Sequence, residues 1–222
     1  MEDGPRRGFG PGGLLRTPGR RRAVAEPGAA DVVLVGDSLT VGEHASQLDR
    51  TYAARLTRAL SAGHFTVSVH AISGGRLDDL LEVPLSLGRR LVVVELGTND
   101  WLGYRPGGVW RPTPTERFGE AYGRLLDRVM GPGAALVSLG VWGPAQGRSQ
   151  AGGVVAEYDA VISGSCLRRG GSFVALSAVY EDATARGPAG RRTPFGVADT
   201  MHPNDTGHRR MANLVLQTVP SL

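Results

Sequence analysis

A serine follows directly after a short apolar run near the start of the chain. Residues 31–36 read DVVLVG, and Asp37, Ser38 and Leu39 come next. If a helix begins after this run, the Ser38 hydroxyl lies at the helix N-terminus, where it is either an ordinary cap or a nucleophile for acyl transfer. The surrounding residues do not form the G-x-S-x-G motif of common serine hydrolases. Taken alone, Ser38 therefore leaves both interpretations open.

A histidine near the other end of the chain is the candidate base. Pro203 disfavours helical angles for His202, which places His202 in a loop just ahead of a final helix. Asp199 lies three residues earlier, close enough for its carboxylate to fold back on the imidazole, fix its tautomer and stabilise the imidazolium. A lone His-Pro-Asn segment is more often a simple helix start, so this pair also depends on the rest of the chain.

Two further segments carry hydrogen-bond donors that acyl-transfer chemistry uses. Ser73 is followed by Gly74 and Gly75, which form either a plain turn or a close approach of a backbone N–H to a reacting carbonyl. Asn99 follows an apolar run that ends at Gly97, and it is either a turn former or a side-chain donor to an oxyanion. The chain thus carries, in order, a nucleophile, two kinds of donor, an orienting carboxylate and a base.

These residues need a scaffold that brings distant segments together, and the chain predicts one. Apolar runs typical of buried strands alternate with amphipathic segments typical of helices. The predicted strands are residues 31–36, 64–73, 91–97, 134–142 and 172–180, and the predicted helical segments are residues 39–62, 76–87, 114–130, 154–170 and 204–219. Five strands that each precede a helix predict a five-stranded parallel sheet between two helical layers, a three-layer α/β/α fold. The polar residues above then lie at the carboxyl ends of strands, where ligands bind in such sheets.

The same residues carry a resemblance to a known family. GDSLT at 36–40, Gly74, GTND at 97–100 and DTMHPN at 199–204 resemble the four blocks of the SGNH hydrolases, which are also called GDSL esterases/lipases. The resemblance extends over residues 31–219. It implies a flavodoxin-like α/β/α fold, an esterase activity, and neither a metal nor an organic cofactor.

The resemblance also implies a role for each residue. Ser38 would be the nucleophile, and His202 would be the general base and then the general acid. Asp199 would orient His202. The N–H groups of Ser38 and Gly74 and the side-chain amide of Asn99 would form the oxyanion hole, with the next glycine as an alternative to Gly74.

Other side chains near these segments have supporting roles in this interpretation. Asp37 and Asp100 are expected to hold the neighbouring loops by hydrogen bonds. Leu39, Trp101 and Trp142 are candidates for an apolar wall against the substrate, although a small hydrophobic cluster explains the tryptophans equally well. No metal site is predicted, because metal-ligand spacing is missing among the remaining histidines, His44, His64, His70 and His208.

Composition limits the class of protein. The 222 residues carry a formal net charge of +4, and all the basic residues are arginine. Much of the excess lies in a Gly-, Pro- and Arg-rich segment, residues 1–29, predicted to be a flexible tail ahead of one domain at 30–222. We interpret its charge as solvated rather than as a nucleic-acid-binding arm. The chain shows no secretion-signal pattern and no apolar run long enough to span a membrane, and Cys166 is its only cysteine, which together favour a cytoplasmic protein.

The sequence therefore predicts a serine esterase. It would hydrolyse a short acyl or acetyl ester of a small molecule or sugar through an acyl-enzyme on Ser38. An acyltransferase that passes the same acyl group to an alcohol or amine is an alternative, because water access decides between the two. A non-catalytic flavodoxin-like binding module is a second alternative, and it requires the whole set of polar residues to be accidental. The natural substrate and the oligomeric state are not predicted.

Overall fold

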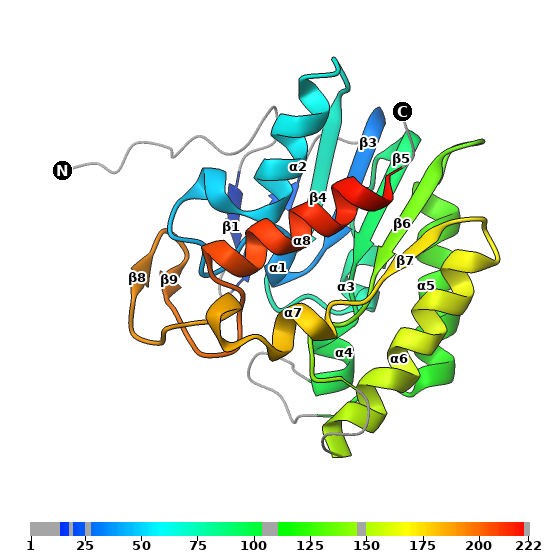
Figure 1. Cartoon of the computed structure of the whole chain (residues 1–222). Coiled ribbons are helices and arrows are strands. Elements are labelled where there is room, and N and C mark those ends of the chain that lie inside the picture. Colours follow the sequence, from blue (N-terminus) through cyan, green and yellow to red (C-terminus); the bar gives the residue numbers. More distant parts are fainter. Residues whose placement is uncertain (1–13, 18–19, 25–27, 104–110, 146–149, 220–222) are drawn as a thin grey trace.

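The computed structural model describes residues 14–17, 20–24, 28–103, 111–145 and 150–219 of the chain. This part forms a seven-stranded sheet with helices on both faces, together with a small two-stranded sheet of β8 (Arg192–Thr193) and β9 (Gly196–Val197) (Figure 1). The predicted three-layer α/β/α fold is therefore confirmed. In the described residues, no helix combines the length and apolar character that crossing a bilayer demands.

Five parallel strands, in the order β4-β3-β5-β6-β7, make up most of the large sheet. They are β3 (Ala29–Gly36), β4 (Val67–Ile72), β5 (Leu87–Glu95), β6 (Ala135–Leu139) and β7 (Ser172–Val174). The strand predicted for residues 172–180 is wrong beyond Val174, because α7 (Ser177–Glu181) follows. The neighbouring β6 ends at Leu139, which pairs with Val174, so the backbone after Val174 has no ladder partner there.

Two more strands extend the sheet beyond β4. β1 (Leu14–Thr17) and β2 (Arg20–Val24) are antiparallel, and residues 22–24 pair antiparallel with β4. At residues 14–17 and 20–24 this differs from the flexible tail expected for residues 1–29, and β3 itself begins at Ala29. Residues 1–13, 18–19 and 25–27 of that segment lie outside the described residues. Composition does not reveal such pairing, because the N–H and C=O groups of an edge strand bind another backbone without apolar side chains. The domain boundary at residue 30 stays a prediction.

The two faces of the sheet pack against different helices. Val33 and Val35 of β3 belong to one buried cluster, whereas Val32 and Leu34 belong to the other, because successive side chains of a strand point to opposite faces. The first cluster includes residues of α3 (Leu77–Leu81), α5 (Thr115–Val129) and α6 (Gln150–Leu167), and the second includes residues of α2 (Tyr52–Ser61), α7 and α8 (Asp205–Thr218). In Figure 1, α8 crosses in front of the strands.

The helical segment predicted for residues 39–62 is two helices separated by a loop. α1 (Ser38–Val41) ends at Gly42, whose φ of 92° lies in the left-handed region. A Cβ on Gly42 would lie 2.0 Å from Cγ2 of Thr51, so glycine is required both for the angle and for the space. The loop at residues 42–51 brings additional side chains to the carboxyl end of β3.

Short helices follow other strands as well. α4 (Thr98–Leu102) comes after β5, and 3-10 turns lie at Leu48–Arg50 and Ala183–Ala185. The loops after β3, β4 and β5 therefore meet at one edge of the sheet, since these three strands are neighbours and run parallel.

Candidate active site

Ser38 lies where β3 ends and α1 begins. Asp37 is the N-cap of α1, and its Oδ1 accepts the Leu39 N–H at 3.0 Å. Gly36 is required one residue earlier, because a Cβ there would lie 1.8 Å from Oγ1 of Thr40. This tight connection holds Ser38 as the first residue of the helix, with 4% of the residue exposed.

His202 reaches Ser38 from the far end of the chain. Oγ of Ser38 is 3.0 Å from Nε2 of His202, and Nδ1 of His202 is 2.9 Å from Oδ2 of Asp199. With the Nδ1–H donated to the carboxylate, Nε2 accepts the serine hydroxyl. Oδ1 of Asp199 accepts the backbone N–H groups of Met201 and His202, both at 2.8 Å, so the loop itself orients the carboxylate. The structure thus brings together the serine, the histidine and the aspartate singled out from the sequence.

Two anchors hold the loop that carries Asp199 and His202. Asn204 caps α8, since its Oδ1 accepts two N–H groups from the first turn of that helix. Trp142 is fully buried, and its Nε1–H donates to the Met201 carbonyl at 2.7 Å. The loop is therefore supported both from the helix and from the core.

The charges around His202 favour its acceptance of a proton. Burial lowers the pKa of His202, but the hydrogen bond to Asp199 and the negative charges of Asp199 and Glu43 outweigh burial and raise it above its ordinary value. Burial raises the pKa of Asp199, yet the hydrogen bonds from the side chain and the backbone N–H of His202 outweigh this effect and hold that pKa well below its usual range. Asp199 is therefore ionised at neutral pH and stabilises a protonated His202.

Two backbone N–H groups at the site, those of Ser38 and Gly74, have no acceptor among the described residues. Gly74 has a left-handed φ of 63° and lines the cavity next to Ser38. The N–H of Gly75 instead donates to the carbonyl of Ile72 at 2.8 Å, and a Cβ on Gly75 would lie 2.7 Å from that same oxygen. The geometry therefore favours Gly74 over Gly75 as a donor into the cavity and gives Gly75 a packing role.

Asn99, the second residue of α4, is 7% exposed. Its Nδ2 donates to Oδ2 of Asp37 at 3.1 Å and to the carbonyl of Gly75 at 3.0 Å. Both amide hydrogens thus have acceptors within the protein, and an oxyanion in the cavity would share one of them in a three-centre bond. The two bonds also tie α4 to the loops after β3 and β4.

Asp100 connects three segments beside the site. Its Oδ2 accepts the Leu77 N–H at 3.0 Å and its Oδ1 accepts the Thr113 hydroxyl at 2.7 Å, while Nε of Arg76 lies 3.6 Å from Oδ1. These contacts join α3, α4 and the segment before α5. They fit the loop-holding role expected for this residue.

Glu95, the last residue of β5, is a buried acid that sequence reasoning missed. Its carboxyl contacts that of Asp37, both residues are fully buried, and Oγ1 of Thr40 donates to Oε2 of Glu95 at 3.0 Å. Burial raises the pKa of both carboxyls, and the charge of Asp37 raises that of Glu95 further, so the pair retains a proton. The available signal was a glutamate inside the apolar run LVVVELG, since a buried acid needs a partner.

A cavity of about 260 Å³ adjoins these groups. Its lining consists of Ser38, Glu43, Ser73, Gly74, Thr98, Asn99, Leu102, Asp199, Met201 and His202. Leu39 and Trp142 are fully buried in the core and Trp101 is half-buried, and none of the three is among the described residues that line this cavity. Leu102 and Met201 supply its apolar surface instead. Substrate contact by Leu39, Trp101 and Trp142 stays a prediction.

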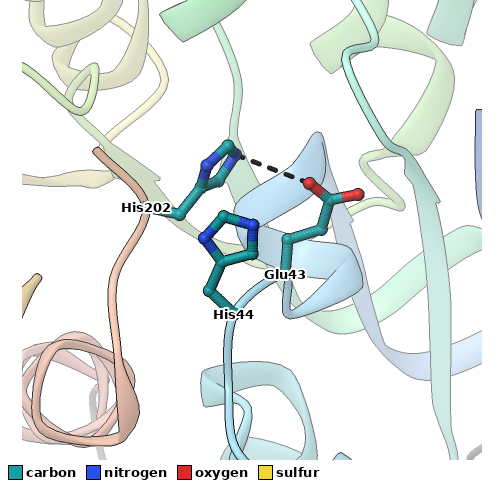
Figure 2. A group of neighbouring side chains, drawn as sticks. All are labelled: Glu43, His44 and His202. Carbon is teal, nitrogen blue, oxygen red and sulfur yellow. Dashed lines mark ion pairs between the residues drawn. The ribbon is translucent and has the colours of Figure 1, made fainter. Parts of the chain in front are cut away.

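One group of possible metal ligands was also missed from the sequence. Within the described ranges, Glu43, His44 and His202 each offer a ligand atom, and these atoms lie within 4.8 Å of one another (Figure 2). Spacing along the chain does not reveal the group, because two members lie in the loop after α1 and the third precedes α8. The local signal is Gly42, which ends α1 and so leaves Glu43 and His44 in a loop next to the site.

Comparisons with known proteins agree with this architecture. A model of the GDSL-like lipase/acylhydrolase family matches residues 34–210. Similar solved structures include phospholipase A1 from Streptomyces albidoflavus NA297 (18% identity, TM-score 0.61, 86% of this chain and 100% of that one) and the acetylxylan esterase Axe2 from Geobacillus stearothermophilus (18%, 0.61, 88% and 96%). An extracellular lipase from Streptomyces rimosus is similar at 19% identity, with a TM-score of 0.57 and coverage of 86% and 100%.

A search of curated proteins found no match. The family match covers well over half of the chain, and the similar structures share its fold. This protein therefore belongs to the GDSL-like lipase/acylhydrolase family and is a carboxylic ester hydrolase.

Proposed function

We propose that the protein hydrolyses short acyl esters of small molecules or sugars through an acyl-enzyme on Ser38. One observation carries the proposal: the hydrogen-bonded path from Oγ of Ser38 to His202 and on to Asp199, with steps of 3.0 Å and 2.9 Å. A base within reach of the hydroxyl, itself oriented by a third group, is the arrangement that activates a serine nucleophile.

In the first half-reaction, the oxygen of Ser38 attacks the ester carbonyl carbon while Nε2 of His202 takes the hydroxyl proton. Asp199 stabilises the imidazolium that forms. The carbonyl oxygen becomes an oxyanion that the N–H groups of Ser38 and Gly74 bind, with the amide of Asn99 as a third donor. Each such donor lowers the barrier by about 3 kcal/mol. His202 then returns the proton to the alcohol as the ester C–O bond breaks.

In the second half-reaction, water replaces the departed alcohol. His202 takes a proton from this water as its oxygen attacks the acyl carbon, and the same donors bind the second oxyanion. Collapse breaks the bond to Ser38, which recovers its proton from His202, and the carboxylic acid leaves. An alcohol or amine in place of water would make the protein an acyltransferase. No feature of the described residues favours a second acceptor over water.

The cavity supports a short acyl group and a polar alcohol. Its volume of about 260 Å³ lies below the range of roughly 300–1,000 Å³ that is usual for larger ligands. Leu102 and Met201 offer limited apolar surface, whereas Glu43 and Ser73 offer polar groups to hydroxyls of the alcohol portion. One of the structurally similar proteins is an acetylxylan esterase, and we extend an acetylated sugar to this chain as a substrate class.

The test compares Ser38→Ala with Ser61→Ala, a matched exposed serine at the end of α2. Ser38→Ala should lower kcat for p-nitrophenyl acetate by roughly 10⁵–10⁶, because the nucleophile is lost. Ser61→Ala should retain wild-type turnover, and circular dichroism should show that both variants fold. A fluorophosphonate probe should label every protein except Ser38→Ala. Turnover that persists in folded Ser38→Ala would contradict the mechanism, and a series of longer esters measures the acyl length.

A further inference from the structure

We propose that Glu43, His44 and His202 form a binding site for Zn²⁺, and that the bound ion blocks ester hydrolysis. Figure 2 shows the three side chains converging, two from the loop after α1 and one from the segment before α8. The binding of the ion is inferred from this geometry alone. The inhibition of hydrolysis rests on the proposed function, in which His202 is the base.

The spacing of the ligand atoms fits a small tetrahedral ion. Oε2 of Glu43 is 3.6 Å from Nε2 of His202, and each of the three residues places a ligand atom within 4.8 Å of the other two. Zinc bound to nitrogen and oxygen at about 2.0–2.2 Å separates its tetrahedral ligands by about 3.3–3.6 Å. Small side-chain rotations therefore close the site, and water takes the fourth position. Two imidazoles and one carboxylate favour zinc, whereas Mg²⁺ and Ca²⁺ prefer oxygen ligands.

Asp199 orients both imidazoles for such a site. Its Oδ2 is 2.9 Å from Nδ1 of His202, and its Oδ1 is 3.3 Å from Nδ1 of His44. A carboxylate that accepts the Nδ1–H leaves Nε2 as the ligand atom and raises the basicity of Nε2. Zinc-binding histidines usually have such a hydrogen-bond acceptor at the ring nitrogen that does not bind the metal. The third ligand is held in the same way, since the Ser73 hydroxyl donates to Oε1 of Glu43 and leaves Oε2 for the ion.

His44 has a defined position and a tautomer that binding would change. Its φ of 67° is left-handed, its ring centroid lies 4.5 Å from that of His202, and its side chain is 9% exposed. Without an ion, Nδ1 of His44 accepts the Asp199 N–H at 3.1 Å, so Nε2 carries the proton. When zinc binds, the Nε2 proton leaves and Nδ1 gains one, which it donates to Oδ1 of Asp199. The imidazole stays neutral, and Nε2 offers its lone pair to the ion.

Bound zinc would prevent hydrolysis because Nε2 of His202 has a single lone pair. Without the ion, this lone pair accepts the Ser38 hydroxyl at 3.0 Å. A zinc–nitrogen bond uses the same lone pair, so Ser38 loses the base that takes its proton. Zinc occupation and hydrolysis therefore exclude each other, and a chelator should restore activity.

The test measures Zn²⁺ binding and hydrolysis separately in the full chain. Isothermal titration calorimetry with ZnCl₂ follows binding, and turnover of p-nitrophenyl acetate in rising ZnCl₂ follows inhibition, with each protein compared to its own rate in chelator. His44→Asn removes one ligand and keeps the backbone, because asparagine tolerates left-handed angles. His64→Asn is the matched control, since His64 is exposed and has a similar φ of 64°. Glu43→Gln removes a second ligand at a position without a left-handed angle.

We expect the wild-type chain and His64→Asn to bind one Zn²⁺ and to lose activity reversibly, with no effect of MgCl₂. In His44→Asn and Glu43→Gln, the zinc concentration for half-inhibition should rise about tenfold or more. Ser38→Ala should bind zinc without any turnover, so a failure of the proposed function leaves the site testable. Absence of binding, or equal zinc affinity in wild type, His44→Asn and Glu43→Gln, would overturn the site. Binding that leaves wild-type turnover unchanged would overturn the block.

Discussion

The pH dependence of hydrolysis tests the charges around His202. Oε2 of Glu43 lies 3.6 Å from Nε2 of His202, and each side chain is 16% exposed. A base must be neutral to accept a proton, so the rate should fall as the pH drops through the pKa of His202, which is raised above its ordinary value. Glu43→Gln removes a negative charge that contributes to this rise. We therefore expect the acid limb of kcat/KM to move to lower pH in the variant.

Coulomb's law gives the size of the shift. Two unit charges about 4 Å apart interact by about 1 kcal/mol in water and by about 4 kcal/mol at the effective dielectric constant near a protein surface. At about 1.4 kcal/mol for each pKa unit, these limits correspond to roughly 0.7 and 3 units. Because both side chains retain some contact with solvent, we expect a shift of about one pH unit.

The assay measures kcat/KM for p-nitrophenyl acetate from about pH 5 to about pH 9 at constant ionic strength, a range that brackets histidine titration. A chelator is present throughout to keep metal ions away from His202. Glu120→Gln is the matched control, because Glu120 is exposed on α5 and is not among the described residues that line the cavity. An unmoved acid limb in Glu43→Gln would refute the reasoning. An equal shift in Glu120→Gln would assign the effect to net charge instead.

Two further predictions concern residues that support the site. Trp142→Phe removes the donor to the Met201 carbonyl. We expect the free energy of unfolding, measured with denaturant, to fall by about 1–3 kcal/mol and kcat to fall as well. Unchanged values of both would contradict the anchoring role. Burial lowers the pKa of His208 to about 4, so its contribution to stability is complete above its unfolded value near 6.5 and is lost as the pH falls toward 4. Over that pH range we expect the free energy of unfolding of the wild type to fall by up to about 3 kcal/mol, and that of His208→Gln to depend less on pH. Equal pH dependence in the two proteins would refute the role given to His208.

Much of the fold could be predicted because its strands are buried on both faces. The runs at 32–35 and 91–94 must be apolar at every position to fill both helical layers, and such runs are visible in a single sequence. The ends of elements depend on distant partners instead. β7 stops at Val174 because β6 stops opposite it, and β2 forms by pairing its backbone with β4. Neither fact is encoded in the local residue pattern.

The residues of the site divide in the same way. Ser38 and His202 carry local signals, one at the end of an apolar strand and the other before a proline, and the parallel topology predicts that their segments meet. Glu43 and Glu95 carry almost none, because the importance of each depends on the group that lies opposite it. Glu43 faces His202, and Glu95 faces Asp37. Sequence reasoning therefore found the reacting groups and missed the charges that surround them.

The pairing of β2 with β4 has a consequence for how the chain behaves when shortened. A protein that begins at residue 28 would leave residues 70–72 of β4, the part that pairs with β2, without a neighbouring strand on that side. An exposed sheet edge of this kind is a template for strands of other copies, and edge-to-edge pairing between copies is a common start of aggregation. We therefore expect the β1–β2 pair to protect the protein against aggregation, and a shortened chain should retain it.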